Sequence, residues 1–126
     1  MLDWIWVAAG GALGSVLRYQ VGGAVQRWNG SDWPLGTLSV NLVGSLVIGG
    51  LAHLVLGRGL LSAEARLFTM VGILGGFTTF SAFSMETLRL LQQGAWEYAL
   101  ANMALSVAGG LAAAWAGFAL ASLLWP

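Results

Sequence analysis

The stretch Gly72-Ile-Leu-Gly-Gly-Phe-Thr-Thr-Phe-Ser-Ala-Phe-Ser84 decides the expected fold. It lies inside an apolar segment, yet it combines two adjacent glycines with two threonines and two serines. Glycine permits a helix to break, and a break in a membrane frees backbone carbonyl and N–H groups that must be buried against protein or bind an ion. The stretch therefore predicts a break at Gly75 and Gly76. Composition alone leaves one alternative open, an ordinary helix with a small-residue packing face.

Outward from this stretch, the chain divides into four apolar segments, at about 4–25, 35–56, 66–91 and 96–124. Each has the roughly 20 residues that a helix needs to cross about 30 Å of hydrocarbon. Short polar breaks separate the segments, at 26–34, 57–65 and 92–94. The pattern predicts an all-α membrane protein. It is a single domain over residues 1–126 with four transmembrane helices, a break in the third, and both termini on one side.

The composition supports a membrane location. Hydrophobic residues make up 58% of the chain and charged residues only 8%, whereas a soluble domain carries about 25% charged residues. Most of the tryptophans lie near the ends of the apolar segments, at the depth of the water–lipid interface, and only Trp115 falls well inside a segment. With no cysteine and a net charge of zero, the chain offers no disulfide, no cysteine-bound metal and no basic patch for nucleic acid.

The arginines predict a dual topology. Arg18, Arg27 and Arg89 lie on the side of the first and third breaks, while Arg58 and Arg66 lie on the other side. Bias in Lys and Arg sets the orientation of a membrane protein, and here the bias is almost absent. We therefore expect copies to insert in both directions and to pair as an antiparallel homodimer. The alternative is that the weak bias still selects one orientation.

Side chains from three segments reach similar depths in the membrane. At 1.5 Å per residue from the first-break side, Asn41 lies roughly 10 Å deep, Phe83 about 12 Å, Ser106 about 14 Å and Phe80 about 16 Å. Independent packing choices need not agree in depth, so the agreement favours a shared pore. Pairing of Asn41 with a neighbouring helix remains an alternative.

Phe80 and Phe83 are three residues apart and share one helix face. The edge of a phenyl ring is electropositive, so a ring presented edge-on to a pore favours an anion without a fixed charge that would trap it. Conduction needs binding that is favourable and still weak enough for release. Contact with lipid or with the protein core is the ordinary alternative for both rings.

The titratable groups form no acid–base or nucleophilic constellation, so we do not expect an enzyme. His53 is the only histidine, and its place near the end of a segment indicates an interfacial position. Glu86 is the only carboxylate well inside a segment, where it titrates, pairs with Arg89 or faces a vestibule. Arg18 extends to the interface or draws anions to an entrance. The residues alone do not rank these roles.

At three motifs in order, the chain resembles the Fluc family of fluoride channels, also called CrcB proteins. The motifs are Gly10-Gly-Ala-Leu-Gly-Ser-Val-Leu-Arg-Tyr19, Gly36-Thr-Leu-Ser-Val-Asn-Leu-Val-Gly44 and Gly75-Gly-Phe-Thr-Thr-Phe-Ser-Ala-Phe-Ser-Met-Glu86. The resemblance covers the whole chain, and the last motif is the most specific. It implies a passive, fluoride-selective channel that exports fluoride from the cytoplasm and lowers its toxicity. It also implies a multi-pass protein of the bacterial inner membrane, surrounded by lipid.

The resemblance further implies an antiparallel homodimer with two fluoride pores. The implied pore residues are Asn41, Phe80, Phe83, Thr79, Ser81 and Ser106. The backbone carbonyls of Gly75 and Thr78 are implied to bind a structural Na⁺ at the centre of the dimer. Arg18 and Glu86 match family positions that we assign to a vestibule.

Two positions depart from the family pattern in the polar track beside the rings. Ala82 stands where many relatives have Thr, and Asn102 stands where some have Tyr. The main alternative is a transporter of the small multidrug resistance type, which is also small, four-spanned and dual in topology. That mechanism resembles one built on a Glu within the first helix, whereas Asp3 here precedes the first segment. A non-conducting membrane scaffold is a third class.

Overall fold

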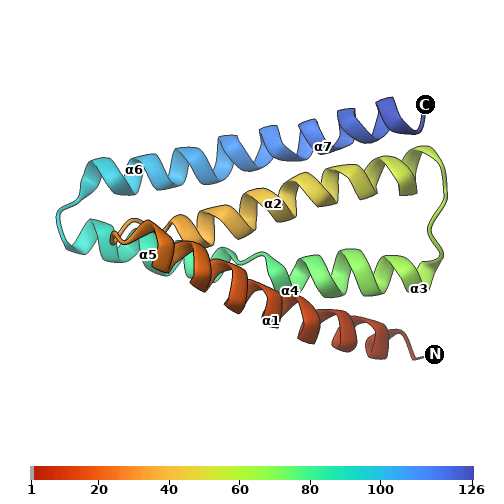
Figure 1. Cartoon of the computed structure of the whole chain (residues 1–126), viewed down its shortest axis with the longest axis horizontal. Coiled ribbons are helices and arrows are strands. Elements are labelled where there is room, and N and C mark those ends of the chain that lie inside the picture. The colour runs from red at the N-terminus through yellow and green to blue at the C-terminus, as the bar shows by residue number, and fades with distance from the viewer. Residues whose placement is uncertain (1) are drawn as a thin grey trace.

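The structure is a computed structural model that describes residues 2–126, which form helices and the loops between them (Figure 1). In chain order the elements are α1 (Asp3–Asn29), α2 (Leu35–Ala52), η1 (His53–Gly57), α3 (Ala63–Arg66), η2 (Leu67–Leu74), α4 (Gly75–Phe77), α5 (Phe80–Gln92), α6 (Trp96–Ala104), η3 (Leu105–Gly109) and α7 (Gly110–Leu124). The η elements are π-helical segments that continue their α-helical neighbours. Consecutive elements therefore form one long continuous helix, as α6, η3 and α7 do.

Within the described residues, three helical stretches are long and apolar enough to cross a membrane: Leu35–Gly57, Ala63–Gln92 and Trp96–Leu124. This bears out the prediction of an all-helical chain with apolar helices of membrane length. Helix α1 has 27 residues but is not one of the three stretches. Its glycines and the polar run at 18–20 lower its mean hydropathy. A membrane crossing by α1, and with it the count of four, stays a prediction.

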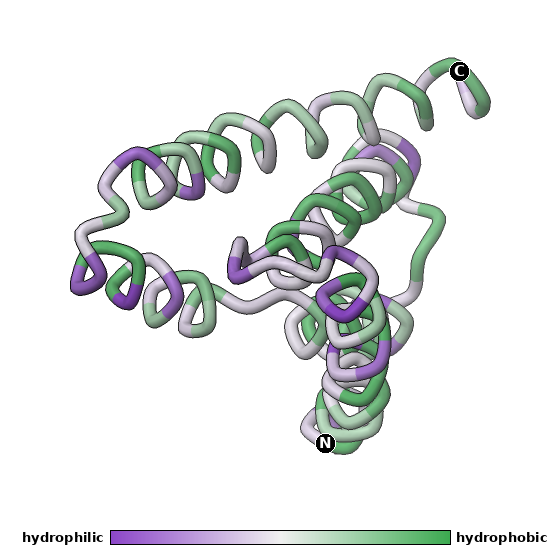
Figure 2. The backbone as a smooth tube through the Cα atoms, turned by 60° about the vertical axis from the view of Figure 1, so that its left-hand side comes forward, coloured by the Kyte–Doolittle hydropathy of each residue, from purple (hydrophilic) through white to green (hydrophobic). Residues whose placement is uncertain are grey.

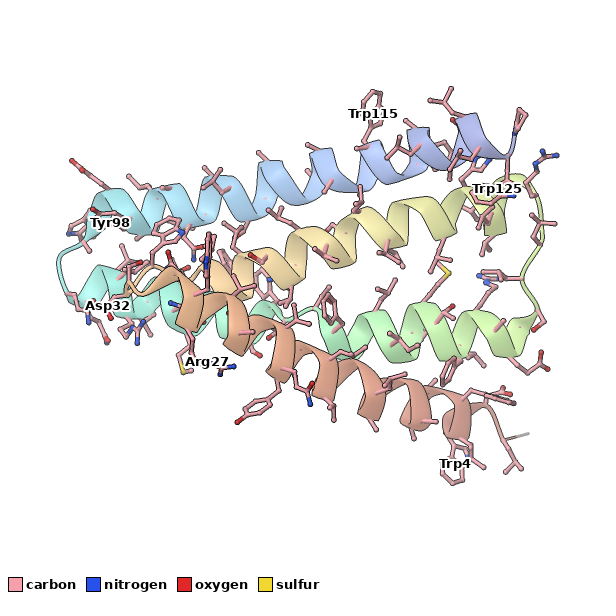
Figure 3. All side chains as sticks on the ribbon, in the orientation of Figure 1. Trp4, Arg27, Asp32, Tyr98, Trp115 and Trp125 are labelled. Carbon is pink, nitrogen blue, oxygen red and sulfur yellow. The ribbon has the colours of Figure 1, made fainter. Side chains whose placement is uncertain are left out.

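Both termini lie at the same end of the molecule (Figure 1). Figure 3 shows Trp4 and Trp125 at that end, and Asp32 and Tyr98 at the opposite end. Trp115 lies between the two ends and points outward, with 74% of its surface exposed. Hydrophilic residues gather near the α1–α2 and α5–α6 connections, while α2 and α7 are hydrophobic over most of their length (Figure 2). Polar residues thus gather near the end of the helices that carries these connections, and apolar residues dominate between the ends, as expected for helices that cross a bilayer.

The helix interruption lies three residues further along the chain than the sequence predicts, at Thr78 and Thr79 instead of Gly75 and Gly76. Gly75 and Gly76 are helical, within α4, whereas Thr78 and Thr79 are extended, with φ/ψ of −85°/156° and −151°/116°. The reason is that β-branched threonine favours extended backbone. Gly76 is needed for packing instead, because a Cβ there would press on the backbone of Gly11 and Ser15.

Glycines let α1 pack against η2 at backbone distance. A Cβ at Gly10 would collide with the carbonyl oxygen of Phe68, and a Cβ at Gly14 would collide with that of Ile73. Gly10 and Gly14 are the only buried residues of α1 among those described. Small residues of this kind let membrane helices approach closely, which matters in lipid because hydrophobicity does not drive helices together. Helix α1 therefore anchors the rod that carries the interruption.

Substituting Gly14 by Ala is expected to destabilise the protein by about 1–3 kcal/mol, since the added methyl group overpacks a contact with rigid backbone. Gly11→Ala is the matched control, because a Cβ at Gly11 meets its nearest neighbour, the carbonyl oxygen of Gly72, at 4.0 Å. Thermal unfolding in detergent measures both variants. Equal melting temperatures for the two would contradict the close packing of α1 on η2.

Candidate functional site

The interruption between α4 and α5 produces two half-helices whose ends need partners. The side chain of Thr79 accepts a hydrogen bond from the backbone N–H of Ala82 at 3.1 Å and so caps the N-terminus of α5. On the other side of the interruption, Arg18 donates from Nε to the carbonyl oxygen of Gly76 at 2.9 Å. A cation at the C-terminal end of a helix also complements the helix dipole. Sequence reasoning did not foresee this use of Arg18.

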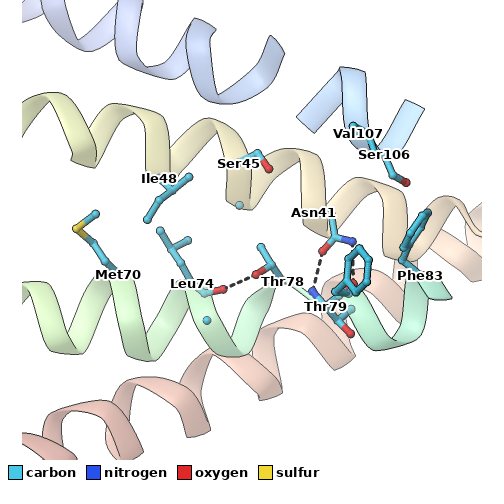
Figure 4. Close-up of a pocket in the computed structure, with 13 residues that line it drawn as sticks. Asn41, Ser45, Ile48, Met70, Leu74, Thr78, Thr79, Phe83, Ser106 and Val107 are labelled. Atoms are coloured by element: carbon cyan, nitrogen blue, oxygen red, sulfur yellow. Dashed lines mark hydrogen bonds between the residues drawn. The ribbon is translucent and has the colours of Figure 1, made fainter. Parts of the chain in front are cut away.

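Asn41 holds the extended backbone of Thr79 at two points. Its Nδ2 donates to the Thr79 carbonyl oxygen at 3.0 Å, and the Thr79 N–H donates to Oδ1 at 2.7 Å (Figure 4). The amide thus replaces the partners that Thr79 loses by leaving the helix. A primary amide has two N–H donors, so one remains for another ligand. Asn41 thus binds a neighbouring element, as one sequence interpretation expects, and it also lines a pocket.

This pocket has a volume of about 390 Å³ and lies between α2, the interruption and η3 (Figure 4). Its lining includes Asn41, Thr79, Phe80, Phe83 and Ser106, together with Gly75 and Thr78. The structure therefore brings together most of the predicted pore residues. None of the side chains that line it is charged.

The two phenyl rings lie at the edge of this first pocket. Their centroids are 5.3 Å apart and their planes are inclined by 47°. Phe83 is partly buried, whereas Phe80 is 77% exposed. Ser81 is exposed and does not line the pocket, although its hydroxyl lies 3.3 Å from that of Thr79. Phe80 thus lines the pocket and is at the same time open to its surroundings.

A second pocket, of about 680 Å³, is lined by five charged side chains. Three cationic and two anionic side chains line it, namely Arg18, Arg27, Arg89, Asp32 and Glu86. Thr79 lines both pockets and is the point where they adjoin. An uncharged pocket thus borders a charged one that has a small excess of positive groups.

Glu86 is held by helix α2. The hydroxyl of Thr37 donates to Glu86 Oε1 at 2.7 Å, while the buried Oε2 has no hydrogen-bond partner among residues 2–126. The carboxylate and Arg18 both line the second pocket, where the sequence interpretation placed a vestibule. Thr37 lies one helical turn from Asn41, so one face of α2 holds both the interruption and α5.

A buried polar pair joins α5 to α6. Asn102 is 2% exposed and Thr87 is 5% exposed. Asn102 Nδ2 donates to Thr87 Oγ1 at 3.0 Å, and the Thr87 hydroxyl donates to the carbonyl oxygen of Phe83 at 2.7 Å. Sequence reasoning noted Asn102 but missed Thr87, whose place one turn after Phe83 was the available signal.

The remaining titratable candidates lie away from these pockets. His53 Nε2 is 3.0 Å from the carbonyl oxygen of Trp125, and its ring meets that of Phe118 edge-on. These residues are at the end that carries both termini. Within residues 2–126, no group of three or more His, Cys, Asp and Glu side chains is arranged to hold a metal ion.

Residues 5–118 match the sequence profile of a family described as "CrcB-like protein, Camphor Resistance (CrcB)". The chain belongs to the CrcB family. Three curated relatives each bear the name fluoride-specific ion channel FluC. The relative from Magnetococcus marinus is 47% identical over 119 residues, which are 94% of this chain and 97% of the relative. That from Opitutus terrae is 48% identical over 116 residues, 90% and 88% of the two chains. That from Rhodospirillum rubrum is 46% identical over 125 residues, 98% and 97% of the two chains.

The CrcB match confirms the family inferred from the three motifs. Its relatives are named as ion channels, so the family is one of channels and not of enzymes. The match covers α1 through most of α7 and includes both pockets. It favours a channel over the multidrug transporter and scaffold alternatives.

Proposed function

We propose that this protein is a passive fluoride channel that lets fluoride leave the cytoplasm and so lowers its toxicity. One observation carries the proposal: an uncharged pocket in which two phenyl rings and several hydrogen-bond donors face the same space, from α2, α5 and η3. The names of the curated relatives support the choice of fluoride. Asn41, Thr79, Phe80, Phe83 and Ser106 form the proposed pore lining, with Ser81 beside it.

The chemistry of this pocket suits a small, strongly hydrated anion. Such an ion enters only when fixed groups replace its water. The second N–H of Asn41 and the hydroxyls of Thr79 and Ser106 are donors. The electropositive ring edges of Phe80 and Phe83 add attraction without a full charge. The binding is then weak enough for the ion to leave.

The second pocket serves as the vestibule. Its arginines raise the local concentration of anions before they reach Thr79, where the uncharged pocket begins. Fluoride is the base of a weak acid whose neutral form enters a cell at low pH and ionises inside. The negative interior of the cell then drives the anion out through a passive pore, so the mechanism needs no nucleotide and no proton relay. We place the protein in the bacterial inner membrane as a multi-pass protein.

The open side of the first pocket supports assembly as an antiparallel homodimer. Phe80 exposes 77% of its surface in the single chain, so a second copy is needed to complete the wall. Two copies related by a two-fold axis would form two equivalent pores. The nearly balanced arginines permit the opposite orientations that an antiparallel pair requires.

The residues at the interruption fit a structural Na⁺ between two such copies. Unwound backbone carbonyls at a broken membrane helix are typical ligands of Na⁺. Gly75 is exposed and has open space where a Cβ would stand. The N–H of Thr78 still donates to the carbonyl oxygen of Leu74, but Thr78 is extended and the N–H of Thr79, which a continuing helix would direct to the Gly75 carbonyl, donates to Asn41 instead. The carbonyls of Gly75 and Thr78 from each copy would supply four oxygen ligands. The ion would hold the two interruptions together.

Fluoride efflux from liposomes tests the proposal. Purified protein is expected to release fluoride rapidly down its gradient, without a proton gradient, and to retain chloride, as measured with ion-selective electrodes. Proton-coupled cation exchange would replace the proposal with the multidrug transporter class. A reconstituted protein that passes neither ion would be the scaffold.

A further inference from the structure

We propose that Thr87 and Asn102 are positioning residues that orient Phe83, so that selectivity for fluoride depends on a hydrogen bond between α5 and α6. The inference rests on the proposed function, in which Phe83 meets the ion. Neither Thr87 nor Asn102 lines either pocket. Their effect on the ion is therefore indirect and passes through the backbone of α5.

Helix α5 is weakly buried, which makes its polar contacts decisive. Only Thr87 and Leu90 are buried among its 13 residues. Helix α6 likewise buries one apolar and one polar residue, Ala99 at 0% and Asn102 at 2% exposure, and Asn102 contacts Thr87. Apolar packing of so few side chains restrains the rotation of a helix poorly, because a small turn costs few contacts. The directional hydrogen bond of Asn102 therefore sets the rotation of α5 toward α6.

The direction of the hydrogen bonds links this contact to the ring. A hydroxyl has a single O–H, and Thr87 gives it to the carbonyl oxygen of Phe83. The oxygen of Thr87 is then left as the acceptor for Asn102 Nδ2. Two hydrogen bonds in series therefore connect Asn102 on α6, through Thr87, to the backbone of Phe83, whose ring is proposed to line the pore. Removing the Thr87 side chain breaks both contacts, and removing the Asn102 side chain breaks the tie between this turn and α6.

Thr87 and Asn102 are both buried, so each side chain needs the other as its hydrogen-bond partner. Variants at both positions can therefore separate an effect on the orientation of Phe83 from an effect on stability. Thr87→Val keeps the shape of the side chain but leaves the buried Asn102 amide without its partner, which destabilises the fold. Thr87→Val combined with Asn102→Leu replaces both partners by apolar groups of similar size, and such a pair is nearly neutral for stability. A purely structural contact would therefore recover function in the double variant, whereas a positioning contact would not.

The test compares these variants in liposomes and in thermal unfolding. Thr87→Val is expected to lower the melting temperature by about 5 °C, and the double variant is expected to regain most of this loss. Both variants are expected to show about fivefold slower fluoride efflux, which corresponds to the free energy of one interhelical hydrogen bond in a membrane. Both are also expected to discriminate less against chloride. Thr87→Ser keeps the hydroxyl and is expected to behave like the wild type.

Thr69→Val is the matched control. Thr69 makes the same hydrogen bond to a carbonyl one turn earlier, that of Ala65 at 2.6 Å, but within residues 2–126 no side chain of another helix hydrogen-bonds to it. Its efflux and selectivity are expected to be unchanged. Wild-type efflux and selectivity in the double variant would overturn the inference, and so would a loss in Thr87→Ser equal to that in Thr87→Val.

A readout without fluoride separates this inference from the proposed function. The chain has no cysteine, so Met85→Cys, on an exposed position of α5, gives a single site for a nitroxide label. The label is expected to become more mobile in the double variant, while a label at Trp115→Cys on α7 stays unchanged. Unaltered mobility at position 85 would refute the positioning role. Absence of fluoride efflux in the wild type would refute only the channel.

Discussion

Fluoride efflux through Phe80→Ile is expected to fall at least about 100-fold, which corresponds to about 2.7 kcal/mol on the barrier. Ile is apolar and of similar bulk, so the pocket stays closed to lipid and the rod still packs. It lacks the electropositive edge that a phenyl ring presents to an anion. The ion would then leave its water without a replacement on this side of the pocket. Electrode recordings of fluoride efflux from liposomes measure the loss.

The control for this variant is Phe118→Ile. Phe118 is also partly exposed, at 42%, but it packs against His53 at the other end of the molecule and lines neither pocket. Its substitution is expected to leave efflux within about twofold of the wild type, since surface changes away from a site have small effects. Wild-type efflux in Phe80→Ile would remove the ring-edge argument. Size-exclusion profiles of both variants verify that the protein remains folded.

The second large effect is expected for Asn41→Asp, which should also reduce fluoride efflux at least about 100-fold. The substitution places a negative charge in a pocket that has no other charged side chain, where an anion must pass. It also replaces the Nδ2 donor by an oxygen that faces the Thr79 carbonyl oxygen, so one of the two contacts becomes repulsive. Both the path of the ion and the shape of the interruption are disturbed.

Two further variants separate these causes. Asn29→Asp makes the same chemical change at the end of α1, where Asn29 binds Ser31 and Trp33. Asn29 itself lines neither pocket, although Ser31 lines the second, so efflux should be nearly unchanged. Asn41→Leu removes both hydrogen bonds to Thr79 without adding a charge. If the charge dominates, Asn41→Leu conducts measurably better than Asn41→Asp. Normal fluoride efflux through Asn41→Asp would show that Asn41 only holds neighbouring elements together and does not line the path of the ion.

For the candidate site, the sequence pattern predicts the position of a residue along its helix but not its partner on another helix. Asn41, Phe80, Phe83 and Ser106, which the sequence placed at similar depths, line one pocket. Their agreement in depth follows from residue number, because residue number sets axial position in a helix. Rotation about the helix axis does not follow in the same way. The partner of Asn41 is 38 residues away, and that of Arg18 is 58 residues away. Such pairs depend on how whole helices are turned against one another.

The interruption itself illustrates the same limit. A Gly-Gly pair and a Thr-Thr pair lie side by side, and each is a credible place for a helix to end. Packing accounts for the position: α1 meets Gly76 at backbone distance, whereas Gly75 faces open space, and α4 stays helical through Phe77. The threonines were left to adopt the extended conformation that suits their branched side chains.

The amino-acid sequence by itself determined that this protein is helical, apolar and a member of the CrcB family, because composition, segment length and contiguous motifs are local properties. The tertiary structure alone decided that the chain leaves the helix at Thr78 and Thr79, that Asn41 holds this backbone, and that Asn102 reaches Phe83 through Thr87. The physical reason is that each of these features requires a donor and an acceptor from different helices to meet within about 3 Å. Only the packing of the helices brings such pairs together.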